Sequence, residues 1–156
     1  LEVTVPTGQY DADKLLNIGN NRWTVKPEIG VSKAWGTWTV ELNTSVTFFT
    51  DNKEFLNGNT RKQEPLYLVQ GSLIHEFPSG AWLALTGSSL SGGRTTLNGV
   101  EQDDYQRSTR VAATIALPVD QRNSIKFFGS TGISSRTDRD FDLIGVAWQH
   151  RWGGGL

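Results

Sequence analysis

Polar and charged side chains recur at alternate positions along several extended segments, and these residues are the ones that could do chemistry. They are Lys26, Glu28, Glu41, Gln70, Glu76, Arg110, Lys126 and Arg151. Successive side chains of a strand point to opposite faces, so residues at alternate positions share one face. If that face encloses water, the charges line a pore and set its selectivity. If it encloses a narrow interior, the charges must pair with one another in a salt-bridge network.

Patterns typical of enzymes are weak in this chain. His75 and His150 fall among the apolar positions near short turns, where an interfacial role is expected, and this leaves no histidine to activate a serine. The Asp103-Asp104 pair fits an acidic, solvated loop tip better than an acid/base pair or a cation site. The segment "SGGRTTLNG" lacks the Lys-Ser/Thr and the following helix of a phosphate loop. We therefore expect no enzyme activity, catalytic residue, metal or cofactor.

The segments that carry the polar residues are predicted to be strands. In "NRWTVKPEIGVSKAWGTWTVELNTSVTFF", residues 21–49, apolar and polar residues alternate, and the tight Gly36-Thr37 step between two tryptophans predicts a hairpin. Residues 11–19 show a weak helical period that fits one turn. The same alternation predicts eight strands, at residues 1–8, 21–35, 38–50, 65–77, 81–91, 106–117, 123–136 and 140–152.

The connections between these strands alternate in length. Segments 9–20, 51–64 and 92–105 are long and polar, whereas the turns at 36–37, 78–80 and 119–122 are short. Long loops at one rim and short turns at the other are typical of outer-membrane barrels. The long loops carry acidic residues beside Arg61, Lys62 and Arg94, which could bridge divalent cations to lipopolysaccharide.

Aromatic residues gather near the strand ends on the apolar face. Twelve residues separate Trp23 from Trp35, which corresponds to about 40 Å of strand. A tilt of about 40° reduces this to roughly 30 Å along the membrane normal, close to the apolar band with its aromatic girdles. The residues expected at the membrane interface are Trp23, Trp35, Trp38, Phe48, Tyr67, Phe77, Trp148 and Trp152.

Composition narrows the class of protein. The 156 residues suit one domain, 1–156, and a net charge of −1 gives no electrostatic footprint for nucleic acid. The absence of cysteine excludes disulfides and thiolate metal sites. A mean hydropathy of −0.38 alone argues for a soluble barrel or sandwich with its apolar face inward. The alternative is a membrane barrel, which needs only every second residue to be apolar.

Several segments carry a resemblance to a known family. "PTGQYD", "NRWTVKPEIGVSKAWG", "TFFTDN", "GGRTT" and "DFDLIGVAWQHRWGGGL" resemble bacterial outer-membrane proteins assigned as transporters of the meta-pathway of phenol degradation. The resemblance covers nearly the whole chain and implies an outer-membrane β-barrel that passes small, often aromatic compounds. It supplies no catalytic or binding residues. Members of that family are longer and have extra strands before the matched stretch, so the number of strands stays open.

The leading prediction is an all-β, antiparallel, up-and-down transmembrane barrel with eight strands in this chain, alone or within a larger barrel. Its predicted function is passive uptake of small hydrophobic or aromatic compounds across the bacterial outer membrane, with lipid and lipopolysaccharide as partners. The alternative is a closed eight-stranded structural or interaction barrel, because eight strands leave room only for side chains or one small ligand. In that case the lumen is salt-bridged and the long loops bind a partner.

Overall fold

The computed structural model describes residues 1–135 and 141–153, which form strands and no helix. The long strands are β4 (Trp38–Phe49), β7 (Leu66–Glu76), β8 (Trp82–Gly92), β11 (Gln106–Pro118), β12 (Asn123–Ser135) and β13 (Leu143–His150). β3 (Glu28–Trp35) is as long as β13, and the short strands are β1 (Glu2–Thr4), β2 (Thr24–Lys26), β5 (Asn52–Phe55), β6 (Asn59–Gln63), β9 (Thr95–Leu97) and β10 (Val100–Glu101). The described residues contain no helix long and apolar enough to cross a membrane.

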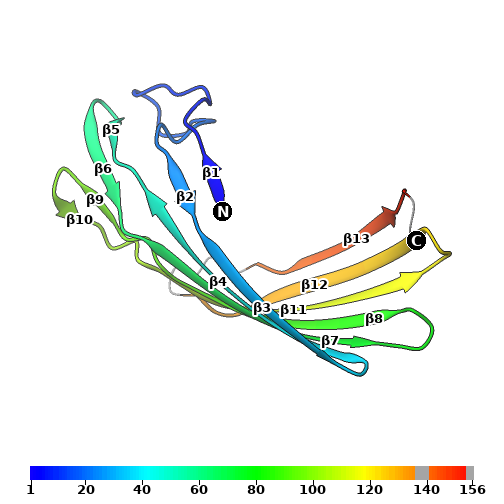
Figure 1. Cartoon of the computed structure of the whole chain (residues 1–156). Coiled ribbons are helices and arrows are strands. Elements are labelled where there is room, and N and C mark those ends of the chain that lie inside the picture. Colours follow the sequence, from blue (N-terminus) through cyan, green and yellow to red (C-terminus); the bar gives the residue numbers. More distant parts are fainter. Residues whose placement is uncertain (136–140, 154–156) are drawn as a thin grey trace. The chain divides into compact units, whose positions relative to one another are not determined.

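The main sheet follows the order of the chain, as an up-and-down sheet does. Its strand order is β1-β2-β4-β7-β8-β11-β12-β13, and β3 also pairs with β4 (Figure 1). β12 is antiparallel to β11 on one side and to β13 on the other. The all-β antiparallel fold predicted from the alternation is therefore confirmed. The order ends at β1 and β13, so among the described residues the sheet is not closed.

Several predicted boundaries were wrong. The first strand covers only Glu2–Thr4 instead of residues 1–8, and residues 11–19 form turns and bends with no helical turn. The strand predicted at 21–35 is divided into β2 and β3 at Pro27. Proline has no N–H to give to a ladder, which explains the break. The Pro27 carbonyl still accepts a hydrogen bond, of 3.2 Å, from the Val46 N–H.

Two of the segments predicted as long loops form a second sheet. Its strand order is β10-β9-β6-β5, with Arg61 opposite both Asn52 and Leu97. These strands are short, and β6, with the sequence NTRKQ, has no apolar face that would show as alternation. The β9–β10 hairpin turns at Asn98 and Gly99, which both have positive φ. An Asn-Gly step between two extended segments is a strong hairpin signal, and it was overlooked in the sequence.

The chain divides into two compact units. Unit 1 comprises residues 1–29, 44–68 and 90–107. Unit 2 comprises residues 30–43, 69–89 and the described part of 108–156. Unit 1 holds the whole second sheet, and unit 2 holds β12 and β13. The assignment of residues 1–156 to one domain stays a prediction.

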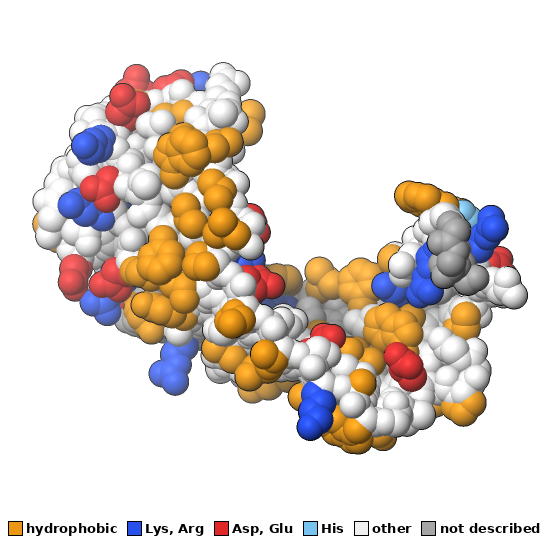
Figure 2. Space-filling view, in the orientation of Figure 1, with side chains coloured by type: hydrophobic (Ala, Val, Ile, Leu, Met, Phe, Trp, Pro, Cys, Tyr) orange, Lys and Arg blue, Asp and Glu red, His pale blue; other side chains and the backbone are white. Residues whose placement is uncertain are grey.

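The apolar positions of the main sheet are exposed. The exposed fractions of Val31, Leu42 and Ile115 are 64%, 50% and 36%. Among the described residues the buried hydrophobic side chains are Ala84 and Ala116, both small. In the left-hand part of Figure 2, hydrophobic side chains form a band beside a region where charged side chains gather. The soluble alternative, with the apolar face packed into a core, is therefore wrong.

Candidate functional site

The charged residues predicted to line a lumen divide between the two units. In unit 1, Lys26 lies opposite Glu2 in the β1–β2 ladder, and its Nζ lies 3.7 Å from the Glu2 Oε2. The same Nζ lies 3.6 Å from Glu28 Oε2. Lys26 therefore stands between two carboxylates, and Glu2 is a partner that the sequence analysis did not identify. All three groups are at least partly exposed, so each pair contributes less than about 1 kcal/mol.

In unit 2, two of the predicted cations contact aromatic rings. Arg110 Nη2 donates to the Phe141 carbonyl at 2.6 Å and to Ser130 Oγ at 3.3 Å. Its guanidinium carbon lies 4.1 Å from the centroid of the Phe141 ring. Lys126 Nζ lies 5.4 Å from the centroid of the Trp82 ring. Both contacts are cation–π interactions, in which a positive charge lies against the face of an aromatic ring.

The remaining predicted polar residues are dispersed. Glu41 and Gln70 are half-buried at alternating positions of β4 and β7, whereas Glu76 and Arg151 are exposed. The Glu76 N–H donates to the Thr37 carbonyl, and the Arg151 N–H donates to the Arg122 carbonyl. Of the eight predicted lumen residues, only Lys26 and Glu28 pair with each other within the part of the chain that the structure describes. That this face lines a lumen stays a prediction.

The face that carries Lys126 also carries large apolar side chains. Residues directly opposite each other in a ladder share a face, and the register pairs Lys126 with Ala116 and Ala147, Phe128 with Gly145, and Ser130 with Leu143. Phe128 and Leu143 are both exposed there. No role was predicted for Phe128 or Leu143 from the sequence. Together with Trp82, they give the polar face of unit 2 an apolar and aromatic component.

The eight aromatic residues predicted at the membrane interface are all exposed. In unit 2, the His75 ring lies between two of them, with its centroid 4.4 Å from that of Trp38 and 4.6 Å from that of Phe77. The His150 ring lies 6.2 Å from Trp148 and 6.1 Å from Trp152. Both histidines therefore lie among aromatic rings. Their interfacial role, like that of the aromatic residues, stays a prediction.

Asn123 fixes the second aromatic group. Its Oδ1 accepts a hydrogen bond from Trp148 Nε1 at 3.1 Å and lies 2.9 Å from His150 Nδ1. Its Nδ2 donates to Asp120 Oδ2 at 2.7 Å, and Asp120 Oδ1 accepts the N–H groups of Arg122 and Asn123. These hydrogen bonds lower the pKa of Asp120. The short turn at 119–122 is therefore held by a carboxylate that stays ionised.

Two cavities have different chemistry. In unit 2, an open groove of about 780 Å³ has a wall formed by Leu85, Val111 and Ile144 on the apolar face. Gly87 and Gly129 lie at its floor, where a Cβ would meet nothing closer than 3.5 Å. In unit 1, a cavity of about 190 Å³ is lined by asparagines, Tyr10 and two arginines. Neither cavity was predicted from the sequence, because each is formed by segments far apart in the chain.

The predicted loop chemistry is mostly internal. Asp51 Oδ2 lies 3.5 Å from Lys62 Nζ, and Arg94 Nη1 lies 2.9 Å from Glu101 Oε2. Asp104 accepts hydrogen bonds from the N–H and the hydroxyl of a buried threonine, Thr95. No group of three or more His, Asp or Glu side chains able to hold a metal occurs in residues 1–135 and 141–153. Bridging of cations to lipopolysaccharide stays a prediction.

Comparison with known proteins identifies a family and a solved structure of similar fold. The family model described as "Putative MetA-pathway of phenol degradation" matches residues 1–149. The crystal structure of the COG4313 outer membrane channel from Pseudomonas putida F1 aligns with a TM-score of 0.79 at 24% identity. The alignment covers 94% of this chain and 55% of that one, so the chain spans about half the length of the channel. No curated protein matches the chain.

Proposed function

The chain belongs to the family described as "Putative MetA-pathway of phenol degradation", and we propose that its strands form part of the wall of a channel in the bacterial outer membrane. The channel passes small hydrophobic compounds, aromatic ones among them. The fold is shared with a solved outer membrane channel. This chain corresponds to about half of that structure. Transport, its substrate and the width of the pore are therefore proposed for the full-length protein and do not follow from the shared fold.

The observation that carries the proposal is the exposure of the apolar face. Along β4, the apolar residues Trp38, Val40, Leu42 and Phe48 are exposed, and the polar residues on the opposite face are half-buried or buried: Thr39, Glu41, Asn43, Ser45 and Thr47. Burying apolar area contributes about 25 cal/mol per Å². A large apolar sheet face is therefore stable only against acyl chains or another apolar surface. A lipid bilayer supplies such an environment to every strand of the sheet at once.

The opposite face supports an aromatic or hydrophobic solute over an ionic one. In unit 2 it combines Lys126 against Trp82 with the exposed rings and aliphatic groups of Phe128 and Leu143. Aromatic solutes stack on such rings with about 0.5–1.5 kcal/mol beyond the burial of area. Cations next to them attract a phenolate or a carboxylate. A pore meant for small ions alone needs charged side chains or backbone carbonyls and no aromatic surface.

The test is solute flux through the full-length protein in liposomes. Phe128 and Phe127 are neighbours on β12 and point to opposite faces, so Phe127→Ala is a matched control for Phe128→Ala. We expect the wild-type protein to pass phenol. The Phe128→Ala variant should change its rate by about threefold or more, as loss of one stacking contact implies, and Phe127→Ala should leave it unchanged. Absence of phenol flux and of ion conductance in the wild-type protein contradicts the channel.

A second candidate function is a structural or interaction protein, and the second sheet favours it. The segments that were predicted as loops are ordered in unit 1 by the β10-β9-β6-β5 sheet, which presents a shaped surface outside the main sheet. A protein that only binds a partner needs no open lumen. The flux assay distinguishes the two functions, because this second candidate predicts folded, inserted protein without flux.

A further inference from the structure

We propose that the cavity of unit 1 is a binding site for a small organic anion, a carboxylate with an apolar body. The cavity has a volume of about 190 Å³ and is lined by both Arg22 and Arg61. It lies between the segment 10–22 and the strands β5 and β6. The inference is independent of transport, because binding is measured without flux.

Arg22 is the residue that most clearly indicates an anionic ligand. Its guanidinium carbon lies 4.4 Å from the centroid of the Phe49 ring, and Nη2 donates to Gln63 Oε1 at 2.6 Å. Its Nε and Nη1 are buried and have no hydrogen-bond partner among the described residues. A buried donor without a partner is costly. A carboxylate in the cavity beside this guanidinium supplies a negative charge that Arg22 lacks, and a charge-assisted hydrogen bond to arginine is stronger than one between neutral groups.

Arg61 adds a second positive charge to the same cavity. Its guanidinium carbon lies 5.0 Å from the centroid of the Phe55 ring, and Phe55 also lines the cavity. Burial lowers the pKa of Arg22, and the charge of Arg61 lowers it further, so the two cations repel each other. No carboxylate among the described residues forms an ion pair with either arginine. The charge of Arg61 lowers the pKa of Asp104, but the two carboxylate oxygens of Asp104 already accept hydrogen bonds from Thr95.

Hydrogen bonds of Asn52 fix another part of the cavity wall. Asn52, 3% exposed, donates to the Tyr10 hydroxyl at 2.9 Å and to the Asn20 carbonyl at 3.2 Å. The Tyr10 hydroxyl in turn donates to the Glu54 carbonyl at 3.1 Å. A Cβ at Gly19 would lie within 3.1 Å of the Gly8 backbone, so two segments of unit 1 meet there with no room for a side chain. The cavity is therefore built by tertiary contacts.

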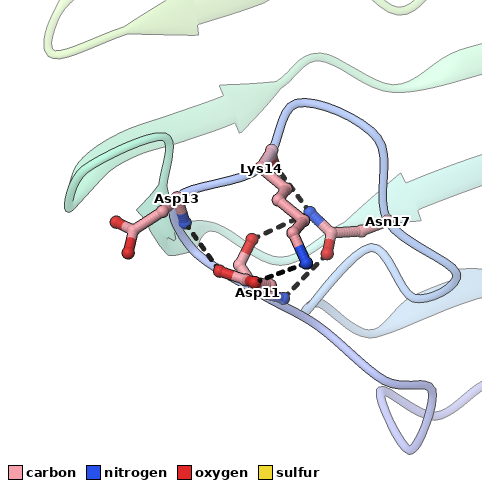
Figure 3. Close-up of polar contacts among 4 residues, drawn as sticks. All are labelled: Asp11, Asp13, Lys14 and Asn17. Carbon is pink, nitrogen blue, oxygen red and sulfur yellow. Dashed lines mark hydrogen bonds and ion pairs between the residues drawn. The ribbon is translucent and has the colours of Figure 1, made fainter.

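The segment 11–17 is held together by polar contacts among Asp11, Asp13, Lys14 and Asn17 (Figure 3). Asn17 Oδ1 accepts the Asp11 N–H at 2.7 Å, and its Nδ2 donates to the carbonyls of Asp11 and Lys14. Lys14 Nζ lies 3.1 Å from Asp11 Oδ2. This closed set of bonds places Leu15 and Leu16, both exposed, at the cavity. An aliphatic rim over two cations fits a ligand with one anionic end and one apolar end.

The experiment is calorimetric titration of the full-length protein in detergent with benzoate, benzyl alcohol and inorganic phosphate. We expect saturable benzoate binding, no detectable benzyl alcohol binding, and weaker binding of phosphate. Arg22→Gln and Arg61→Gln should each weaken benzoate binding at least about tenfold, since each removes a charge-assisted contact or a nearby charge. Arg107→Gln, an exposed arginine of unit 1 that does not line the cavity, should bind as the wild-type protein does.

The Arg22→Lys variant keeps the positive charge but lacks the planar guanidinium group. It is the control for the case in which Arg22→Gln fails to fold. It should retain the near-UV circular dichroism of the wild-type protein and still bind benzoate less tightly. Equal affinity for benzyl alcohol and benzoate overturns the anion site. Equal affinity for phosphate and benzoate overturns the organic part of the proposal. Undiminished benzoate binding in both arginine-to-glutamine variants overturns the assignment to this cavity.

Discussion

The ring of Phe128 lies over Gly145, its direct cross-strand partner, so closely that a Cβ on Gly145 would collide with it. An aromatic side chain that covers a glycine on the next strand restores the packing that the glycine gives up. The pair lies on the face that also carries Lys126 and Leu143. The position of the Phe128 ring therefore depends on the missing side chain at 145.

The first prediction tests this relationship. Gly145→Ala should lower the free energy of unfolding by about 1–3 kcal/mol, the usual cost of overpacking, because the Phe128 ring must leave its place. Gly87→Ala is the matched control, since a Cβ at Gly87 meets nothing within 4 Å. Urea unfolding in detergent micelles measures both variants. Equal stabilities of the two variants would mean that the ring is not held over Gly145.

The second prediction concerns Asn52, which holds the segment 10–21 to β5. Asn52→Ala removes its hydrogen bonds to Tyr10, Asn20 and Asn21. Buried groups left unpaired cost about 1–3 kcal/mol, so we expect amide hydrogen exchange in residues 10–21 to become about tenfold faster or more. Exchange in β12, which belongs to unit 2, should not change. An unchanged rate in residues 10–21 would contradict the role assigned to Asn52.

The third prediction is a pH dependence of the β9–β10 hairpin. Burial raises the pKa of Asp104, but the hydrogen bonds from Thr95 and the charge of Arg61 outweigh it, and the net effect lowers the pKa. A carboxyl with a lowered pKa stabilises the fold above its unfolded pKa of about 3.9, and this stability is lost as the pH falls through the folded pKa. The rate of amide hydrogen exchange in residues 95–101 should therefore rise, relative to the rate in β12, below about pH 4.

Two variants separate Asp104 from general acid effects. Asp104→Asn should abolish this pH dependence and give fast exchange in residues 95–101 at neutral pH. Asp103→Asn, at the neighbouring exposed residue, should keep the dependence. A wild-type hairpin whose exchange relative to β12 is the same at pH 3 and pH 7 would show that the Asp104–Thr95 bonds do not hold the hairpin.

The main sheet was predictable because its two faces meet different surroundings. Alternation in residues 38–49 marks β4 to within one residue, and the Gly36-Thr37 step marks the turn before it. Where a strand has no contrasting faces, the signal fails. β6 has polar or charged residues at all its positions, and β1 is only three residues long. The break at Pro27 follows from local chemistry and was available from the sequence.

The cavity of unit 1 was not predictable in the same way. Arg22 meets Gln63, 41 residues later, and Asn52 meets Tyr10, 42 residues earlier. Such contacts depend on the arrangement of the second sheet, which alternation does not reveal. The local signals for that sheet were the Asn57-Gly58 step between β5 and β6 and the Asn98-Gly99 step between β9 and β10. The aromatic interface positions and the charged positions were placed on opposite faces by parity alone, since neither placement needs distant contacts.

Orientation is the central claim, and cysteine labelling in proteoliposomes tests it most directly. The chain has no cysteine, so Leu42→Cys and Glu41→Cys each introduce one thiol, on opposite faces of β4, in the full-length protein. A charged, membrane-impermeant maleimide added on both sides should label Glu41→Cys, in a water-filled lumen, and leave Leu42→Cys unlabelled in lipid. Rapid labelling of Leu42→Cys together with protection of Glu41→Cys would contradict the account.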